Sequence, residues 1–406
     1  MTVHRITRHR FLAGGIALTA LGVSRWARAE AKSVPSAAPT PGLPQSIRVH
    51  LFSGLGVTRV EISGSAPLDL SIGSATRSLP SIAFDATGAL TGELTKLSVG
   101  DAPVTVRSTA PLTVNAFSAT ASLALHHYDS PIVLQRSGAA VLAVNSVDLE
   151  SYVGATLASE ISPSWPQECL KAQAIVARTY AVHAAVHSAG RPYDVTDDTS
   201  NQVFAGLDGI VPVFTAATTA TAGMTLQAAG QPADVFYSAT CGGHTADSQE
   251  LTGRQSPPYL QGIPDSENGG KPYCTPSPFF AWENTVKAID LARVVGDLAD
   301  IQVKDRWNDG RAKTVRVVRT EAGSYDMDAR QFYTQCASVL GYKVVPSTMF
   351  EVTETVDGYL FKGHGLGHGV GMCQWGARGR AIAGQTAAQI VEAYFPGTAL
   401  ANPTIH

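Results

Sequence analysis

The stretch NSVDLESYVGATLASE, residues 145–160, marks the point where strand-like patterning gives way to helical patterning. Asp148 is a good N-cap residue, because its carboxylate can accept a hydrogen bond from the first helical turn. The side chains that follow it on one helical face are Leu149, Tyr152, Val153, Thr156 and Leu157. Pro163 ends this helix. A second, alanine-rich helix is expected from near Pro166, a residue suited to the first helical position, to about His187.

The residues before this stretch predict a β-rich N-terminal region. From residue 46 to about 143, short alternating segments are broken by Gly, Pro, Ser and Asp. IRVHL (47–51) and VTRVEI (57–62) alternate with a period near two, as strands with one buried face do.

The residues after it mix both element types. Strands and loops are expected beyond Arg191 to about Gly262, followed by a polar, Gly/Pro-rich stretch. Residues 285–298 and 329–340 have helical patterns, with a strand-like segment at 313–320 between them.

The last helix has clear limits. Thr386 and Gln389 can form a capping box, and Pro396-Gly397 should stop the helix. The mixture predicts an α+β fold, with a β-rich region at 46–143 and a mixed α/β core at 144–406.

The N-terminus predicts export. Arg5, Arg8 and Arg10 precede an apolar run at 11–23 that is too short to span a bilayer, and Ala27-Arg28-Ala29 resembles a signal-peptidase site. We therefore expect a signal peptide at 1–29 and a disordered Ala/Pro/Ser-rich linker at 30–45. The protein should reach the periplasm or cell wall, tethered to the membrane if the signal is not cleaved. No later stretch is apolar enough for a membrane span.

Composition limits the classes of function. The 406 residues are 44% hydrophobic, which is enough for a sizeable core and two or three domains. A net charge of −3 provides no basic footprint for nucleic acid.

The five cysteines leave at least one without a disulfide partner. In an oxidising compartment, Cys241 and Cys274 are expected to form a disulfide. A zinc site at Cys241, His244 and Cys274 is an alternative without a clear fourth ligand, and unpaired thiols are another. Cys169, in the first turns of a packed helix, should be buried and inert.

Glu160 is the candidate catalytic residue. It lies at nearly the azimuth of Leu149 and ends the apolar stripe, so its carboxylate should be partly desolvated. Desolvation favours the protonated form, which a general acid for glycosidic cleavage requires. The alternative is a helix-end glutamate paired with a lysine or arginine.

Arg178 is unusual because alanines and aliphatic residues surround it in the second helix. A guanidinium in such surroundings needs a partner, usually a carboxylate. It could pair with Glu160, bind substrate, or reach solvent along its own stem.

A glycine-rich stretch near the C-terminus, GHGLGHGVGMCQWG (363–376), is open to two interpretations. Alternating glycines exclude a stable helix at 363–371 and allow close backbone approach. His364 and His368 could ligate metal, although the spacing is not that of helical zinc proteases. The stretch is either a polar ligand-binding wall or a structural turn.

Several segments, in order, resemble the stage II sporulation protein D (SpoIID/LytB) family. They are VNSVDLESY (144–152), LASEISPSWP (157–166), ECLKAQAIVARTYA (168–181), DTSNQVFAG (198–206), SATCGGHT (238–245) and GHGVGMCQWGA (367–377).

The resemblance implies a lytic transglycosylase that cleaves MurNAc–GlcNAc bonds of peptidoglycan glycan strands with a 1,6-anhydro product. The alternative is a non-catalytic, glycan-binding activator of a cell-wall amidase. The family's acid/base glutamate matches Glu160. The expected substrate-binding residues in a glycan groove are Arg178, Gln202, Tyr237, His244, His368 and Gln374.

Two departures from the family pattern stand out. Some members carry Cys or His in the D-T-x-x-Q loop, where metal is associated with the fold, but this chain has Thr199, Ser200 and Asn201. That metal site is therefore not carried over, and no cofactor is expected. Cys373 stands where the family usually has a serine.

Overall fold

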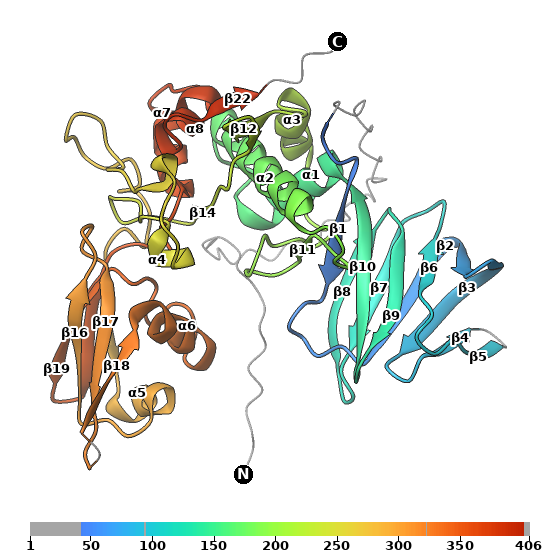
Figure 1. The fold of residues 1–406 in the computed structure, drawn as a ribbon, viewed down its shortest axis with the longest axis horizontal. Helices are drawn as coiled ribbons and strands as arrows, with labels where there is room; N and C mark the ends of the chain where they lie inside the picture. The colour runs from blue at the N-terminus through green and yellow to red at the C-terminus, as the bar shows by residue number, and fades with distance from the viewer. Residues whose placement is uncertain (1–41, 93–94, 322, 402–406) are drawn as a thin grey trace, which may run out of the picture. The chain divides into compact units, whose positions relative to one another are not determined.

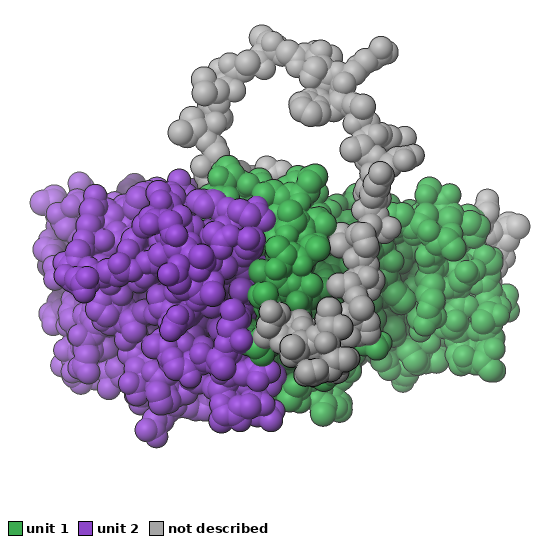
Figure 2. Space-filling view, turned by 90° about the horizontal axis from the view of Figure 1, so that it is seen from above, with its two compact units in different colours: residues 1–165, 177–225, 401–406 green, residues 166–176, 226–400 purple. Residues whose placement is uncertain are grey.

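A computed structural model describes residues 42–92, 95–321 and 323–401 (Figure 1). The expected signal peptide and most of the expected linker lie outside these residues. The chain divides into two compact units (Figure 2). Of the described residues, the first unit comprises those within 42–165, 177–225 and residue 401, and the second comprises those within 166–176 and 226–400.

An eleven-stranded sheet forms most of the first unit, which confirms the β-rich N-terminal region. Its main path runs β11-β1-β10-β9-β6-β2-β3-β4-β5, and β7 joins β2 to β8. The strands are β1 (Ser46–Leu51), β2 (Arg59–Ile72), β3 (Ala75–Asp85), β4 (Ala89–Gly92), β5 (Thr95–Ser98), β6 (Val104–Arg107), β7 (Leu112–Phe117), β8 (Ser122–Tyr128), β9 (Ile132–Ser137), β10 (Ala140–Asp148) and β11 (Val195–Thr196).

The period-two pattern arises, as predicted, from strands with one buried face. Along β7, buried and half-buried residues alternate without a break, so one face of the strand lies in the core. The same alternation begins β1 and β2. Strand β10 runs directly into the first helix, so the change of sequence pattern at Asn145 lies within a strand of this sheet.

Three helices follow the sheet: α1 (Leu149–Glu160), α2 (Gln167–His187) and α3 (Pro212–Ala220). The Asp148 carboxylate accepts hydrogen bonds from the backbone N–H groups of Glu150 and Ser151, which confirms the predicted N-cap. Helix α3 packs on α1. The prediction of strands and loops only after Arg191 was wrong at this helix.

The second unit contains small sheets and short helices. Two three-stranded antiparallel sheets, β15-β20-β19 and β16-β17-β18, share an apolar core with α5 and α6. Its elements are β12 (Thr225–Ala228), β13 (Gln231–Pro232), β14 (Tyr237–Ser238), α4 (Gln249–Thr252), a 3-10 turn (Pro258–Leu260), β15 (Trp282–Val286), α5 (Ala288–Val295), β16 (Asp300–Arg306), β17 (Ala312–Val318), β18 (Ser324–Asp328), α6 (Ala329–Val339), β19 (Phe350–Thr355), β20 (Gly358–Gly363), β21 (Met372–Cys373), α7 (Gln374–Ile382), α8 (Ala387–Tyr394) and β22 (Ala399–Ala401).

Most predicted elements here are confirmed, including α6, β17 and the capping box of α8. The predicted helix at 285–298 was too long at both ends. Its first residues complete β15, and α5 ends at Val295, before Gly296 with φ 85°. Together the two units confirm the α+β class. Across the described ranges, no helix is long and apolar enough to cross a membrane.

Candidate functional site

Glu160 is the last residue of α1 and is half-buried. The helix ends there because Ile161 adopts an extended conformation, with φ −137° and ψ 162°. Glu160 Oε1 accepts a hydrogen bond from the backbone N–H of Val203 at 2.8 Å. This bond brings together two of the sequence motifs, the end of α1 and the 198–206 loop.

The 198–206 loop is fixed by side chains within and beside it. Asn201 Oδ1 accepts from the backbone N–H of Thr196 at 2.8 Å, and Asn201 Nδ2 donates to the hydroxyl of Tyr180 on α2 at 2.7 Å. Just before the loop, the Asp197 carboxylate accepts from the backbone N–H groups of Phe52 and Ser53. Burial raises the pKa of Asp197 to about 6.

Arg178 has a carboxylate partner, as predicted, and that partner is Glu150. Its Nε donates to Glu150 Oε1 at 2.8 Å, and Nη1 donates to the carbonyl oxygen of Met224 at 3.2 Å. Glu150 Oε1 also accepts from the backbone N–H of Gly223 at 3.0 Å. The Arg178 side chain is 0% exposed, so it does not reach solvent. This geometry favours a role in positioning α1 and α2, and the predicted substrate contact stays a prediction.

Gln202 is fully buried as well. Its Nε2 donates to the Tyr152 hydroxyl at 3.1 Å and to the carbonyl oxygen of Ala177 at 3.3 Å. The residue therefore joins the loop to α1 and α2. Its expected contact with glycan stays a prediction.

The other four predicted site residues belong to the second unit. Tyr237 lies on β14, which pairs in parallel with β21. The ring of His244 bonds through Nδ1 to the carbonyl oxygen of Thr245 at 2.7 Å. Gln374 begins α7, is buried, and donates from Nε2 to Gln173 Oε1 at 3.5 Å.

His368 is held as a neutral ring. Its Nδ1 accepts a hydrogen bond from the backbone N–H of Val370 at 3.0 Å. Desolvation by its surroundings lowers its pKa to about 4, so the imidazole is uncharged at neutral pH. Binding roles for these four residues stay predictions.

The glycine-rich stretch allows close backbone approach. Gly371 has φ 73°, and a Cβ there would collide with the carbonyl oxygen of Phe236 beside β14. A Cβ at Gly376, in the first turn of α7, would collide with the Tyr394 hydroxyl and the Asp265 carboxylate. These contacts favour the structural interpretation of the glycines.

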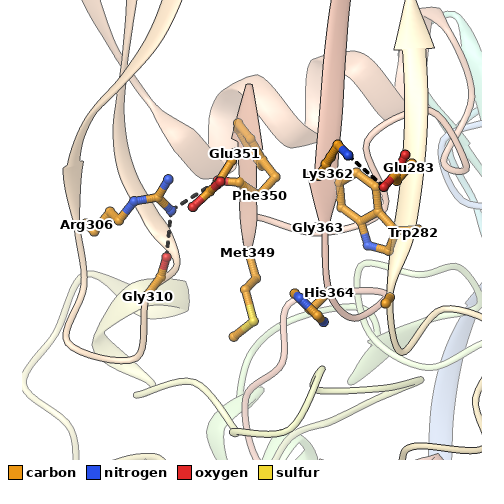
Figure 3. Close-up of a pocket in the computed structure, with 11 residues that line it drawn as sticks. Trp282, Glu283, Arg306, Gly310, Met349, Phe350, Glu351, Lys362, Gly363 and His364 are labelled. Carbon is orange, nitrogen blue, oxygen red and sulfur yellow. Dashed lines mark hydrogen bonds and ion pairs between the residues drawn. The ribbon is translucent and has the colours of Figure 1, made fainter. Parts of the chain in front are cut away.

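An open hollow in the second unit is lined by residues of both charges (Figure 3). Arg306 donates from Nη1 to the carbonyl oxygens of Gly310 and Phe350 on one side. Lys362 pairs with Glu283 at 2.8 Å on the other, and Met349 lies between them. His364 is exposed here, and its Nδ1 bonds to the carbonyl oxygen of Phe280 at 2.9 Å. This hollow was not predicted from the sequence.

A cluster of thiols corrects the cysteine predictions. The Sγ atoms of Cys241 and Cys274 lie 3.7 Å apart and both residues are free, whereas a disulfide requires about 2.05 Å. The expected disulfide is therefore wrong. Cys373 and Asp265 complete a buried group whose four ligand atoms lie within 4.8 Å of one another.

This is the group of possible metal ligands found among the described residues, and it contains no histidine. The alternative zinc set of Cys241, His244 and Cys274 shares its two cysteines with this group, and no group with His364 or His368 is found among the described residues. Cys169 is buried in α2 as predicted, and burial raises its pKa to about 12. A thiol with that pKa is inert at neutral pH.

Comparison with known proteins agrees with these motifs. The family model described as stage II sporulation protein matches residues 137–227, which include α1, α2, the 198–206 loop and α3. An uncharacterized protein of Brachyspira hyodysenteriae is 32% identical over 260 residues, covering 63% of this chain and 67% of that protein. The chain belongs to the stage II sporulation protein D family.

Two relatives from Bacillus subtilis (strain 168) carry names. Stage II sporulation protein D is 26% identical over 296 residues, covering 67% of this chain and 80% of that protein. The amidase enhancer is 27% identical over 286 residues, covering 60% of this chain but 39% of that longer protein. The family supports a cell-wall-related, extracytoplasmic role for this chain.

Proposed function

We propose that this protein is a peptidoglycan lytic transglycosylase with Glu160 as its acid/base. The observation that supports this proposal most is the placement of Glu160. A half-buried carboxyl group ends α1, and the Val203 N–H holds its Oε1 at 2.8 Å. A hydrogen bond to one oxygen fixes the orientation of the group, which a proton-transfer catalyst needs.

Glu160 would act twice on the MurNAc–GlcNAc bond. As an acid, it protonates the bridging oxygen as the bond to the anomeric carbon breaks. As a carboxylate, it then accepts the proton of the muramoyl 6-hydroxyl, whose oxygen bonds to the anomeric carbon and closes the 1,6-anhydro ring. One carboxyl group suffices because no water is activated, whereas hydrolytic glycosidases use two.

The Arg178–Glu150 pair supports this arrangement indirectly. Glu150 and Glu160 lie at opposite ends of α1, and Arg178 ties the N-terminal end of that helix to α2 and to the turn before β12. The 198–206 loop, held by Gln202 and Asn201, presents Val203 to Glu160. We assign these residues positioning roles.

The test is product analysis of purified glycan strands. The wild-type protein should release fragments that end in 1,6-anhydro-MurNAc, and Glu160→Gln should lower their formation by about 10²–10⁴-fold while keeping the fold and glycan binding. Glu168→Gln is the matched control: Glu168 is also a half-buried helical glutamate, bonded to Lys171 and to the backbone N–H of Ala387. This control should retain turnover. Reducing ends without anhydro sugar would indicate hydrolysis and contradict the proposal.

A second candidate is a glycan-binding activator of a cell-wall amidase. The specific observation is that Arg178 and Gln202 are fully buried and bonded to the protein itself. A relative bears the name amidase enhancer. If Glu160→Gln stimulates a cell-wall amidase as well as the wild type does, and neither protein releases anhydro sugar, activation becomes the leading function.

The proposal includes export to the periplasm or cell wall, peptidoglycan glycan strands as substrate, and no nucleic-acid partner. Tyr237, His244, His368 and Gln374 are proposed as further residues that contact glycan. Each is testable by the glycan affinity of its alanine variant.

A further inference from the structure

We propose that Cys241, Cys274, Cys373 and Asp265 form a structural binding site for one zinc ion within the second unit. The site would stabilise the fold and take no part in glycan cleavage, so it goes beyond the proposed function.

The spacing of the ligand atoms supports zinc. For a tetrahedral ion with Zn–S bonds of about 2.3 Å, neighbouring sulfurs lie about 3.8 Å apart. The Cys241 and Cys274 sulfurs are 3.7 Å apart, and all four ligand atoms lie within 4.8 Å of one another. A disulfide would need the two sulfurs much closer, and unrelated buried thiols have no reason to converge with a carboxylate.

The surroundings of Cys373 suit a thiolate. Its Sγ accepts hydrogen bonds from the backbone N–H of Cys241 at 3.2 Å and from that of Gly376 at 3.3 Å. Cys373 is also the N-cap of α7, where the helix dipole favours negative charge. The serine usual in the family would lack the soft ligand atom that zinc prefers.

Asp265 is oriented by its neighbours. It is 0% exposed, and its Oδ2 accepts from the backbone N–H of Cys274 at 2.9 Å. Its Oδ1 accepts from the Tyr394 hydroxyl, and the Arg380 guanidinium packs over the Tyr394 ring, 5.1 Å from its centroid. Such outer contacts commonly fix a metal-binding carboxylate.

The negative charge of the occupied site has a positively charged side chain beside it. Three thiolates and one carboxylate carry four negative charges, and zinc leaves two. Arg380 Nε lies 3.9 Å from Asp265 Oδ1, and buried Arg311 donates from Nη2 to the carbonyl oxygen of Cys241 at 2.7 Å. The Arg380 guanidinium therefore faces the remaining charge, whereas the charge of Arg311 is already paired with the buried Asp309.

The ligand set also favours a structural role over a catalytic one. Catalytic zinc keeps an open coordination position for water, whereas four protein ligands close the coordination shell. The four residues are all buried, so solvent has no direct access to the ion.

The first experiment measures metal in the full chain, purified without chelator or reductant. We expect elemental mass spectrometry of the wild type to find about one zinc ion per chain. Cys373→Ser should weaken zinc binding at least about tenfold in competition with a chromogenic chelator. Cys336→Ser is the matched control, because Cys336 is equally buried but lies in α6 outside the cluster, and it should keep its zinc. Wild-type protein without zinc, or a Cys373→Ser protein with unchanged affinity, would overturn the proposal.

The second experiment needs no variant, so it stands even if Cys373→Ser fails to fold. In denaturant with a chelator and no reductant, a thiol reagent should label all five cysteines. Labelling of three would show a Cys241–Cys274 disulfide and overturn the proposal.

Cobalt added to metal-free wild type should give thiolate-to-cobalt charge-transfer absorption with a tetrahedral visible spectrum. Bound iron with acid-labile sulfide would overturn zinc in favour of an iron–sulfur centre.

Discussion

Arg178 has no exposed surface, and it donates hydrogen bonds of 2.5–3.5 Å to Glu150, Met224 and Thr218. Removing one member of a buried ion pair leaves the other charge uncompensated, which typically costs about 3–5 kcal/mol. We therefore expect Arg178→Ala to lower the free energy of unfolding by that amount in urea titrations. Arg178→Lys should recover only part of the loss, because lysine lacks the planar fork that bonds Glu150 through two nitrogens.

Arg136→Ala provides the control for this measurement. Arg136 also pairs with a carboxylate, that of Asp101, but both side chains are largely exposed. Exposed pairs contribute little, so the urea midpoint should not change. Equal midpoints for Arg178→Ala and wild type would contradict the structural role given to the buried pair.

The sequence predicted that Arg178 needed a carboxylate, but it did not identify Glu150. The two residues are 28 positions apart, and only the crossing of α1 and α2 brings them together. The same limit applies to the thiol cluster. Cys241 and Cys274 were paired because an oxidising compartment favours a disulfide, whereas Cys373 and Asp265 join them through tertiary packing that no local pattern records.

At the scale of elements, the caps of α1 and α6 offer a matched pair of tests. Asp148 and Asp328 each accept two backbone N–H bonds at the start of their helices. Asp148→Ala and Asp328→Ala should each lower the free energy of unfolding by about 1 kcal/mol. Only Asp148→Ala should also slow formation of anhydro products, because α1 carries Glu160. If both variants slowed it equally, or neither did, the link between α1 and catalysis would lose support.

Helices with strong local signals were predictable. Helices α1 and α8 have caps that can be identified in the sequence, and α2 has a long alanine-rich pattern. Helix α3 (Pro212–Ala220) was missed because it contains three threonines and is short, so its propensity is weak and packing against α1 decides its structure. The predicted helix at 285–298 included the last two residues of β15, Thr285 and Val286, because they extend the helical pattern of α5 toward the N-terminus.

At the scale of the whole molecule, each unit contains a half-buried carboxyl group with a raised pKa. Burial raises the pKa of Asp197 to about 6 in the first unit and that of Glu250 to about 8 in the second. A carboxyl group with a folded pKa above its unfolded value binds protons more tightly when folded. Its stabilising contribution is full below the unfolded pKa and is lost as pH rises through the folded pKa.

We therefore expect these two groups to lower the free energy of unfolding as pH rises from about 4 to 8, whereas His368, with a folded pKa of about 4, contributes the opposite slope between about pH 4 and 6.5. Urea titrations at pH 4, 6 and 8 measure it. Asp197→Asn should flatten this decline between about pH 4 and 6, and Glu250→Gln should flatten it from about pH 4.5 to 8. Variants whose pH dependence of stability matches that of the wild type would contradict the assignment.

The thiol cluster has a consequence for the time course of folding. Its members are far apart along the chain: Cys241 and Cys274 are separated by 33 positions, and Cys241 and Cys373 by 132. Contacts between distant residues form late, because long loops must close first. We therefore expect these thiols to become protected late in folding, and outside the cytoplasm an oxidant that reaches them earlier would trap a non-native pair as a disulfide. The yield of native protein should consequently depend on how quickly the stretch around Cys373 packs against Cys241 and Cys274.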